Sequence, residues 1–469
     1  MYSDIEKSKL QLCLVAGVIN HAIKEMASTT NFEFSNIEIT CKERKKIESL
    51  LSLYKKLTLK NNGFNAESDQ LSVEIKFGLC NFFYNIKEFE NALEILEEII
   101  KSQPNNMKAV YCKILLQESL GMFEQALKSC EKILFANHSD LNTLQRKGIL
   151  LLKLKRGNEA IICFDKVLNR NPNHEPTLYN KGILLSEMAK REEAIVCFDK
   201  VIEINARHVL AWYNKGLLLS EINQQKAIVC FDKVIEINQD HVPAWYNKGF
   251  MCEMLEQFDE AILCYNEVLR INPNHLSALF HRGIILEKVG LAESALECFD
   301  KVLNTNPKHM LALYNKGILL SEMAKREEAI VCFDKVIEIN QDHVPAWYNR
   351  GLAFESLDLF EDALQCYDRI IEIDANYKNI LCQKGRLLSS IGKYKDAINC
   401  FDTILASDPS NTNALYYKSC AMLKDGQKDE SLDILELMVS IDSRYRDVLR
   451  DEKDLEAFKI DKRFLRLMN

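Results

Sequence analysis

The stretch LYNKGILLSEMAKREEAIVCFDKVIEIN at residues 178–205 recurs letter for letter at 313–340, which is 135 positions further along the chain. A second stretch, AIVCFDKVIEINQDHVPAWYN, stands at 227–247 and again at 329–349, which is 102 positions further on. Because 102 is three times 34, and 135 is four times 34 less one, both spacings indicate a 34-residue repeat. One copy, 209–241, has lost a residue, since SEINQQKAIVCF replaces SEMAKREEAIVCF there.

Extending this period along the chain gives eleven repeats between residues 73 and 445. All eight prolines fall at repeat position 2 or 32, where a proline starts or ends a helix and does not interrupt one. The repeats begin at residues 73, 107, 141, 175, 209, 242, 276, 310, 344, 378 and 412.

Each repeat contains two helical patterns of apolar residues. In 209–241 the first pattern has Trp212, Gly216 and Leu219 on one face, and the second has Phe231 and Val234 three apart. Such a helix pair is too small to bury its apolar faces alone, but stacked neighbours bury them for one another. The sequence therefore predicts an all-α solenoid with a continuous core.

Small residues recur at positions 8 and 20, and with the 34-residue period they resemble the tetratricopeptide repeat (TPR). The resemblance implies a right-handed α-solenoid of about eleven TPR helix pairs, in which these small residues let the two helices approach closely. Large residues at positions 4 and 24, such as Trp245 and Tyr265, would fill the remaining space. Position 8 carries Gly148, Gly182, Gly216, Gly249, Gly283, Gly317, Gly351 and Gly385.

The predicted domain organisation has three parts. Residues 1–72 do not fit the repeat and are predicted to form a helical N-terminal extension, with helices near 5–27 and 42–60. Residues 73–445 form the TPR array, and 446–469 resemble the C-terminal capping helix found after such arrays. The cap is predicted to cover the last open helix face with Leu455, Phe458, Phe464 and Leu465.

The composition excludes several classes of function. A net charge of -8 argues against nucleic-acid binding, which needs a basic surface. No apolar run reaches the roughly 18 residues of a membrane helix, so we expect a cytoplasmic protein without a membrane role. Because no phosphate loop, HExxH or GxSxG motif occurs, we expect neither an enzyme nor a cofactor.

Asparagine recurs at position 6, and we call these residues the asparagine ladder. In TPR arrays the first helix of each pair lines the concave surface, so the resemblance implies that the ladder binds the backbone of an extended peptide. An amide side chain both donates and accepts, as that role requires. The alternative is that asparagine only fixes the first helix. Other repeats depart from the pattern, such as those with Arg146, His281 and Gln383 at this position. Arg146 can only donate hydrogen bonds. The ladder consists of Asn180, Asn214, Asn247, Asn315 and Asn349.

The neighbouring positions 5 and 7 are also regular. The resemblance places position 5 in the groove as aromatic contact area, whereas the alternative is packing against the preceding repeat. Lysine or arginine at position 7 would give the groove a basic lining, unless the stems only cover apolar surface. The tyrosines at position 5 are Tyr179, Tyr213, Tyr246, Tyr314 and Tyr348, with Phe280 at the equivalent place.

Cysteine recurs at position 23 and histidine at position 34. Equivalent cysteines, about 10 Å apart by helix packing distances, lie too far apart for disulfides, so we predict buried free thiols. Histidines one repeat apart converge poorly on a metal, so we predict loop and helix-capping roles, and no metal site. The cysteines are Cys163, Cys197, Cys230, Cys264, Cys298, Cys332, Cys366 and Cys400, and the histidines are His174, His208, His241, His275, His309 and His343.

These patterns together predict a protein–protein interaction scaffold that binds an extended or disordered peptide segment in its concave groove. Structural assembly, or self-association through the convex face or the ends of the array, remains an alternative. RNA binding by one base per repeat is a third possibility, but the net charge disfavours it.

Overall fold

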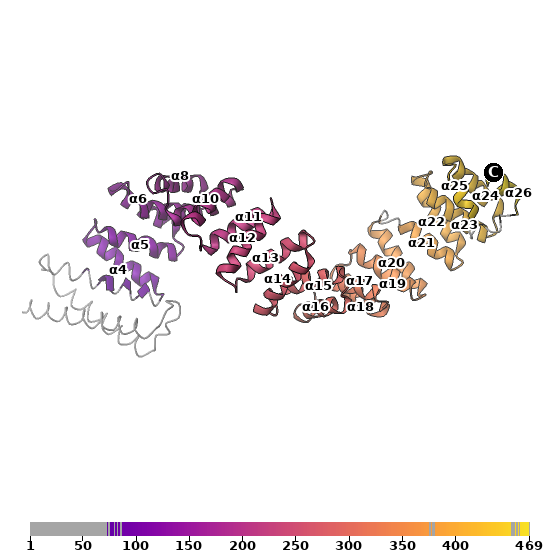
Figure 1. Ribbon diagram of the computed structural model, residues 1–469, viewed down its shortest axis with the longest axis horizontal. Helices are drawn as coiled ribbons and strands as arrows, with labels where there is room; N and C mark the ends of the chain where they lie inside the picture. Colours follow the sequence, from indigo (N-terminus) through magenta and orange to yellow (C-terminus); the bar gives the residue numbers. More distant parts are fainter. Residues whose placement is uncertain are drawn as a thin grey trace, which may run out of the picture. The chain divides into compact units, whose positions relative to one another are not determined.

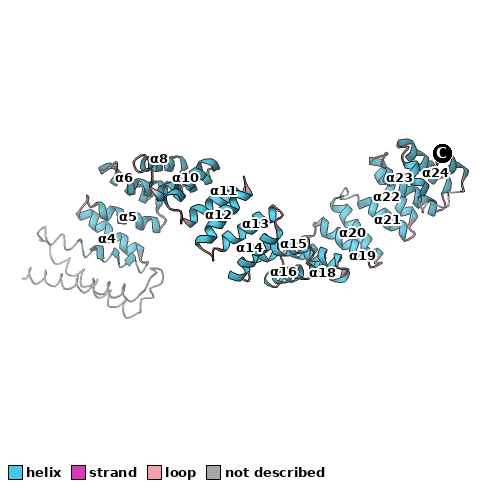
Figure 2. Ribbon diagram, viewed as in Figure 1, coloured by secondary structure: helices cyan, strands magenta, loops and turns pink. Residues whose placement is uncertain are grey.

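The computed structural model describes residues 73–468, except 74–75, 79, 82, 85–86, 375–376, 378–379, 452–454, 456–457 and 459. Every regular element in this part of the chain is a helix, as predicted (Figure 2). The helices expected at 5–27 and 42–60 lie outside the described residues. The chain divides into two compact units, Met1–Ile237 and Asn238–Asn469.

In the first unit α4 is the second helix of the first predicted repeat, and the helices from α5 to α12 follow one another in antiparallel pairs, one pair for each predicted repeat (Figure 1). The bounds are α4 (Phe89–Ser102), α5 (Met107–Ser119), α6 (Phe123–Ala136), α7 (Leu141–Lys153), α8 (Gly157–Leu168), α9 (Glu175–Glu187), α10 (Arg191–Ile204), α11 (Val209–Ser220) and α12 (Gln224–Ile237).

The second unit continues the same pattern and ends in two short helices (Figure 1). The bounds are α13 (Val242–Met254), α14 (Phe258–Ile271), α15 (Leu276–Lys288), α16 (Ala292–Thr305), α17 (Met310–Glu322), α18 (Arg326–Ile339), α19 (Val344–Glu355), α20 (Phe360–Ile373), α21 (Ile380–Ser390), α22 (Tyr394–Ser407), α23 (Thr412–Lys424), α24 (Lys428–Ile441), α25 (Tyr445–Asp451) and α26 (Lys462–Met468).

The turn between the two helices of a repeat contains a left-handed residue at position 15. Glycine adopts this conformation in four repeats, for example at Gly290 (φ 80°), whereas others use residues such as Ala189 (φ 57°) and Ala324 (φ 61°). The short repeat is the exception, because no described residue of its turn 221–223 has a positive φ. The residue missing from 209–241 is therefore the one that other repeats place in the left-handed region.

The glycines at position 8 allow an aromatic ring to lie against the first helix. A Cβ at Gly317 would lie 2.6 Å from Cε1 of Phe333, and one at Gly182 would lie 2.8 Å from Cε1 of Phe198. Both distances are shorter than an ordinary carbon–carbon contact of about 3.5–4.0 Å. The close approach predicted from the small residues is confirmed, and the ring at position 24 is what fills the space.

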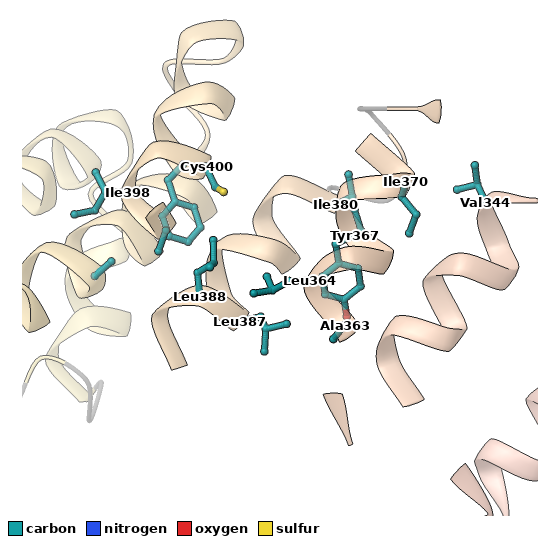
Figure 3. Close-up of a cluster of buried hydrophobic side chains, with 13 residues drawn as sticks. Val344, Ala363, Leu364, Tyr367, Ile370, Ile380, Leu387, Leu388, Ile398 and Cys400 are labelled. Atoms are coloured by element: carbon teal, nitrogen blue, oxygen red, sulfur yellow. The ribbon is translucent and has the colours of Figure 1, made fainter. Parts of the chain in front are cut away.

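The core passes from one repeat to the next. In the second unit Tyr367 of α20 packs with Ile380 and Leu387 of α21, and Cys400 of α22 extends the same cluster (Figure 3). This arrangement is the shared burial that a solenoid requires.

The C-terminal segment covers the end of the array largely as predicted. Leu455, Phe458 and Phe464 are buried against Leu432 and Leu435 of α24. The prediction for Leu465 is wrong, because 46% of this residue is exposed. Phe464 precedes it on the same helix, and only one of two adjacent helical residues can face the array.

Candidate functional site

The asparagine ladder and its tyrosines lie on the first helices of their repeats. Each asparagine follows its tyrosine directly, and all ten side chains are half-buried. In the first unit they belong to α9 and α11, and in the second unit to α13, α17 and α19.

Two ladder asparagines tie successive repeats together. Nδ2 of Asn214 donates to the hydroxyl oxygen of Tyr179 at 3.0 Å, and Nδ2 of Asn349 donates to that of Tyr314 at 3.0 Å. Asn180 instead donates to the backbone carbonyl of Pro176, one turn earlier, at 2.8 Å. These three side chains therefore have a structural role. Only the bond of Asn180 lies within the first helix, as the alternative interpretation of the ladder expected, whereas the other two join neighbouring repeats.

The tyrosine rings fill the junction between repeats. The centroid of Tyr179 lies 5.9 Å from that of Phe198 in its own repeat and 5.0 Å from that of His208, which caps the first helix of the next repeat. Tyr314 has the same two neighbours, Phe333 at 6.2 Å and His343 at 5.2 Å. Packing therefore explains one side of each of these rings, and the hydroxyl lies beside the next ladder asparagine.

Most cations at position 7 form ion pairs between repeats, whereas Arg282 donates to Sγ of Cys298. Nζ of Lys181 lies 2.7 Å from Oδ1 of Asp165, which stands at position 25 of the preceding repeat. Arg350 and Asp334 form the equivalent pair at 2.6 Å. Because carboxylates balance the charges of these paired cations, they do not give the groove a basic lining. That lining was one of the two interpretations of position 7 in the sequence. Further pairs of this kind are Lys147–Glu131, Lys215–Asp199, Lys316–Asp300, Lys384–Asp368 and Lys418–Asp402.

A basic side chain paired with a carboxylate replaces the asparagine at two ladder positions. Nη1 of Arg146 lies 3.1 Å from Oε2 of Glu118, and Nδ1 of His281 lies 3.0 Å from Oε2 of Glu253. In both pairs the carboxylate stands 28 residues earlier, at position 12 of the preceding repeat. Sequence reasoning missed these partners, although this shared 28-residue spacing could have revealed them.

The environment of Glu253 keeps it ionised. Its Oε2 also accepts a hydrogen bond from the hydroxyl of Tyr265 at 2.8 Å. Burial raises the pKa of Glu253, but the hydrogen bonds from His281 and Tyr265 outweigh it and hold the pKa below its usual range. The same carboxylate and burial raise the pKa of Tyr265, whose hydroxyl therefore stays protonated.

Most histidines at position 34 cap the first helix of the following repeat, as predicted. In each, Nδ1 accepts a hydrogen bond from the backbone N–H three residues later, at 3.0 to 3.2 Å. His174 differs, because its Nδ1 pairs with Oγ1 of Thr177. Oε1 of Glu175 lies 3.7 Å from Nε2 of His208. The capping histidines are His208, His241, His275, His309 and His343.

The cysteines at position 23 are all buried and free, which confirms the prediction. Burial raises the pKa of Cys230 and of Cys366 to about 11 in each case, so these thiols are protonated at neutral pH. Within the described residues no group of three or more side chains is arranged to hold a metal ion. None of the described helices combines the length and apolar character needed to cross a membrane.

Comparisons with known proteins agree with the geometry. Models described as tetratricopeptide repeat match residues 141–174, 175–208, 209–241, 242–275, 312–343, 344–377 and 382–445. Because these matches cover more than half of the sequence, the chain belongs to the TPR family. Proteins of this family mediate protein–protein interactions.

Two solved structures show the extent of the similarity. One is described as the crystal structure of YrrB, a TPR protein with an unusual peptide-binding site, and is 26% identical with a TM-score of 0.37. That match covers 40% of this chain and 97% of YrrB. A crystal structure of MamA is 26% identical with a TM-score of 0.33, and the match covers 34% of this chain and 95% of MamA. A comparison with curated proteins finds no match.

Proposed function

We propose that this protein is a cytoplasmic adaptor that binds an extended peptide segment of a partner protein along the first helices of its repeats. The asparagine ladder would bind the peptide backbone, and the neighbouring tyrosines would supply apolar contact area. The proposal names no enzyme activity, cofactor or metal. Protein–protein interaction is the general role of the family, and peptide binding along the first helices would be the form that it takes in this chain.

The observation that carries the proposal is the unused acceptor of the ladder amides. Asn180, Asn214 and Asn349 each donate one hydrogen bond through Nδ2, and this bond orients the amide. No donor among the described residues reaches Oδ1 of these three side chains, nor that of Asn315. The three bonded amides therefore each present an oriented oxygen that a peptide N–H can reach.

The spacing of the ladder suits an extended chain. Successive repeats lie about 10 Å apart by ordinary helix packing distances, and an extended peptide rises about 3.3 Å per residue. One ladder asparagine therefore meets about every third peptide residue. Each hydrogen bond contributes about 1 kcal/mol net, so affinity would build up over several repeats.

The test is a pull-down from cell extract with the wild type and with a variant in which all five ladder asparagines are changed to alanine. A matched variant carries five alanines at position 22 of the second helices, where aliphatic side chains are 51% to 57% exposed. Circular dichroism must show all three proteins equally folded. The position 22 residues are Ile162, Val196, Val229, Leu263 and Val331.

Partners lost from the ladder variant but kept by the position 22 variant would support the proposal. The reverse pattern would refute it and would favour assembly through the second helices. That second candidate rests on the same five exposed aliphatic side chains. Size measurement across protein concentration tests it independently, because a monomer at all concentrations counts against self-association.

A further inference from the structure

We propose that the chain contains two equivalent peptide-binding sites, one in each compact unit, and that it binds two copies of the same extended segment. This inference rests on the proposed function, because it assigns the number and the partner of that same kind of site. The segment would carry an acidic side chain at one end and would bind two ladder asparagines through its backbone.

The two sites are related by the 135-residue offset found in the sequence. Adding 135 to the first-unit ladder residues Asn180 and Asn214 gives the second-unit residues Asn315 and Asn349. Asn247 has no asparagine 135 positions before or after it and belongs to neither set. Each set lies within a single unit.

The bond between asparagine and tyrosine has the same geometry in both sites. Asn214 reaches the hydroxyl of Tyr179 at the same 3.0 Å that separates Asn349 from the hydroxyl of Tyr314. The two tyrosine rings also contact a capping histidine at similar centroid distances, 5.0 Å for Tyr179 and 5.2 Å for Tyr314. The bond from Asn180 to the carbonyl of Pro176 has no counterpart at Asn315 among the described residues. Both tyrosines lie in the identical stretches 178–205 and 313–340, which accounts for part of the agreement.

The charged parts of the two sites agree although their residues differ. Glu118 is held by Arg146, and at the offset positions Glu253 is held by His281, with side chains of both glutamates 13% exposed. A basic residue therefore faces the same carboxylate in both units. Since arginine and histidine are different residues, identical sequence does not explain this agreement.

A second basic residue accompanies each pair. Nζ of Lys153 lies 3.0 Å from Oε1 of Glu118 and 5.3 Å from the ring centroid of Phe123. Its offset partner Lys288 lies 5.6 Å from the ring centroid of Phe258. The charge of Lys288 also helps to lower the pKa of Glu253. Each cluster thus has a lysine near its carboxylate. A carboxylate of the bound segment would pair with that lysine, which is why the segment should be acidic at that end.

Two equivalent sites would make the protein bivalent. A partner with two copies of the segment would bind both units, and the second contact would form at a high effective concentration. Avidity of this kind raises apparent affinity by about 10² to 10⁴ without any new contact. Two partner molecules with one segment each would instead be joined by the chain.

The test uses a random 12-residue peptide library displayed on phage, selected on the full chain, followed by calorimetric titration with the most enriched synthetic peptide. A first-unit variant carries Asn180→Ala with Asn214→Ala, and a second-unit variant carries Asn315→Ala with Asn349→Ala. A fourfold variant combines them. Val196→Ala with Val331→Ala is the matched control, because it removes one exposed side chain outside the ladder in each unit.

We expect wild type and the control variant with Val196→Ala and Val331→Ala to bind two equivalents of one acidic peptide, each two-residue ladder variant to bind one, and the fourfold variant to bind none. Selections on the two-residue variants should give the same consensus. One equivalent in the wild type, or unrelated consensus sequences, would overturn bivalence while the ladder stands. Unchanged binding by the fourfold variant would instead overturn the proposed function itself.

The two-residue variants also remove hydrogen bonds between repeats and could lose helicity. Lys153→Glu and Lys288→Glu then replace them, since Lys153 is 41% exposed and both act on the charged clusters. Each should weaken one of the two equivalents by about tenfold, the effect of losing about 1.4 kcal/mol. An equal effect on both equivalents, or no effect, would overturn the proposal.

Discussion

The contact between Gly317 and Phe333 gives a prediction whose sign depends on the neighbouring side chain. In Gly317→Ala the new Cβ would lie 2.6 Å from Cε1, 3.0 Å from Cδ1 and 3.0 Å from Cζ of Phe333. Such crowding costs about 1–3 kcal/mol, whereas alanine gains about 1 kcal/mol over glycine in a helix. We expect a net loss of about 1 kcal/mol, which lowers Tm by about 2–4 °C.

A double-mutant cycle separates the two effects. Phe333→Val removes all three ring atoms that crowd the new Cβ, so in that background Gly317→Ala should stabilise the protein by about 1 kcal/mol. The coupling energy between the two positions is then about 2 kcal/mol. Gly182→Ala with Phe198→Val provides an independent repeat of the measurement in the first unit. Thermal unfolding followed by circular dichroism measures all variants, and additive effects would refute the reasoning.

Three further predictions concern helix caps, turns and the C-terminal segment. Burial lowers the pKa of His241 below its unfolded value, and Nδ1 must be unprotonated to accept its capping hydrogen bond. The stability of the folded chain should therefore fall as the pH drops below about 6.5, the usual pKa of an unfolded histidine. Changing His241 to asparagine should remove that loss between pH 7.5 and 5.5, and equal acid sensitivity would contradict it. Ala324→Gly should raise the unfolding free energy by about 0.5–1 kcal/mol, because glycine adopts a positive φ without strain. Urea-induced unfolding measures this, and a lower midpoint urea concentration in the variant would contradict it. Phe458→Ala should cost about 3–5 kcal/mol, as a buried aromatic does, whereas Leu465→Ala should change the unfolding free energy by less than about 0.5 kcal/mol.

The fold was predictable because one pattern is repeated many times. The duplicated stretches fix the period, and the prolines at positions 2 and 32 fix the helix ends. Buried cysteines and capping histidines followed from the same alignment. The failure at Leu465 has a physical cause: a single copy of a capping helix has no repeated pattern to show which of two adjacent apolar residues faces the core.

The candidate site was predictable only in part. The sequence identified Asn214 and Tyr179 as surface candidates, but it could not show that the amide of one donates to the hydroxyl of the other. That bond joins residues 35 positions apart in neighbouring repeats, so it depends on how the repeats stack. The carboxylate partners of Arg146 and His281 were missed for the same reason.

The repeated junction also has a consequence for how the chain can change in length. Several neighbouring repeats meet through the same kinds of contact: a capping histidine, an ion pair from position 7 to position 25, and packing of the ring at position 5. An added copy of a repeat such as 310–343 would present matching surfaces at both of its ends. Gain or loss of whole repeats can therefore occur in a single genetic step without a new core, and binding length becomes a trait that evolves in units of 34 residues.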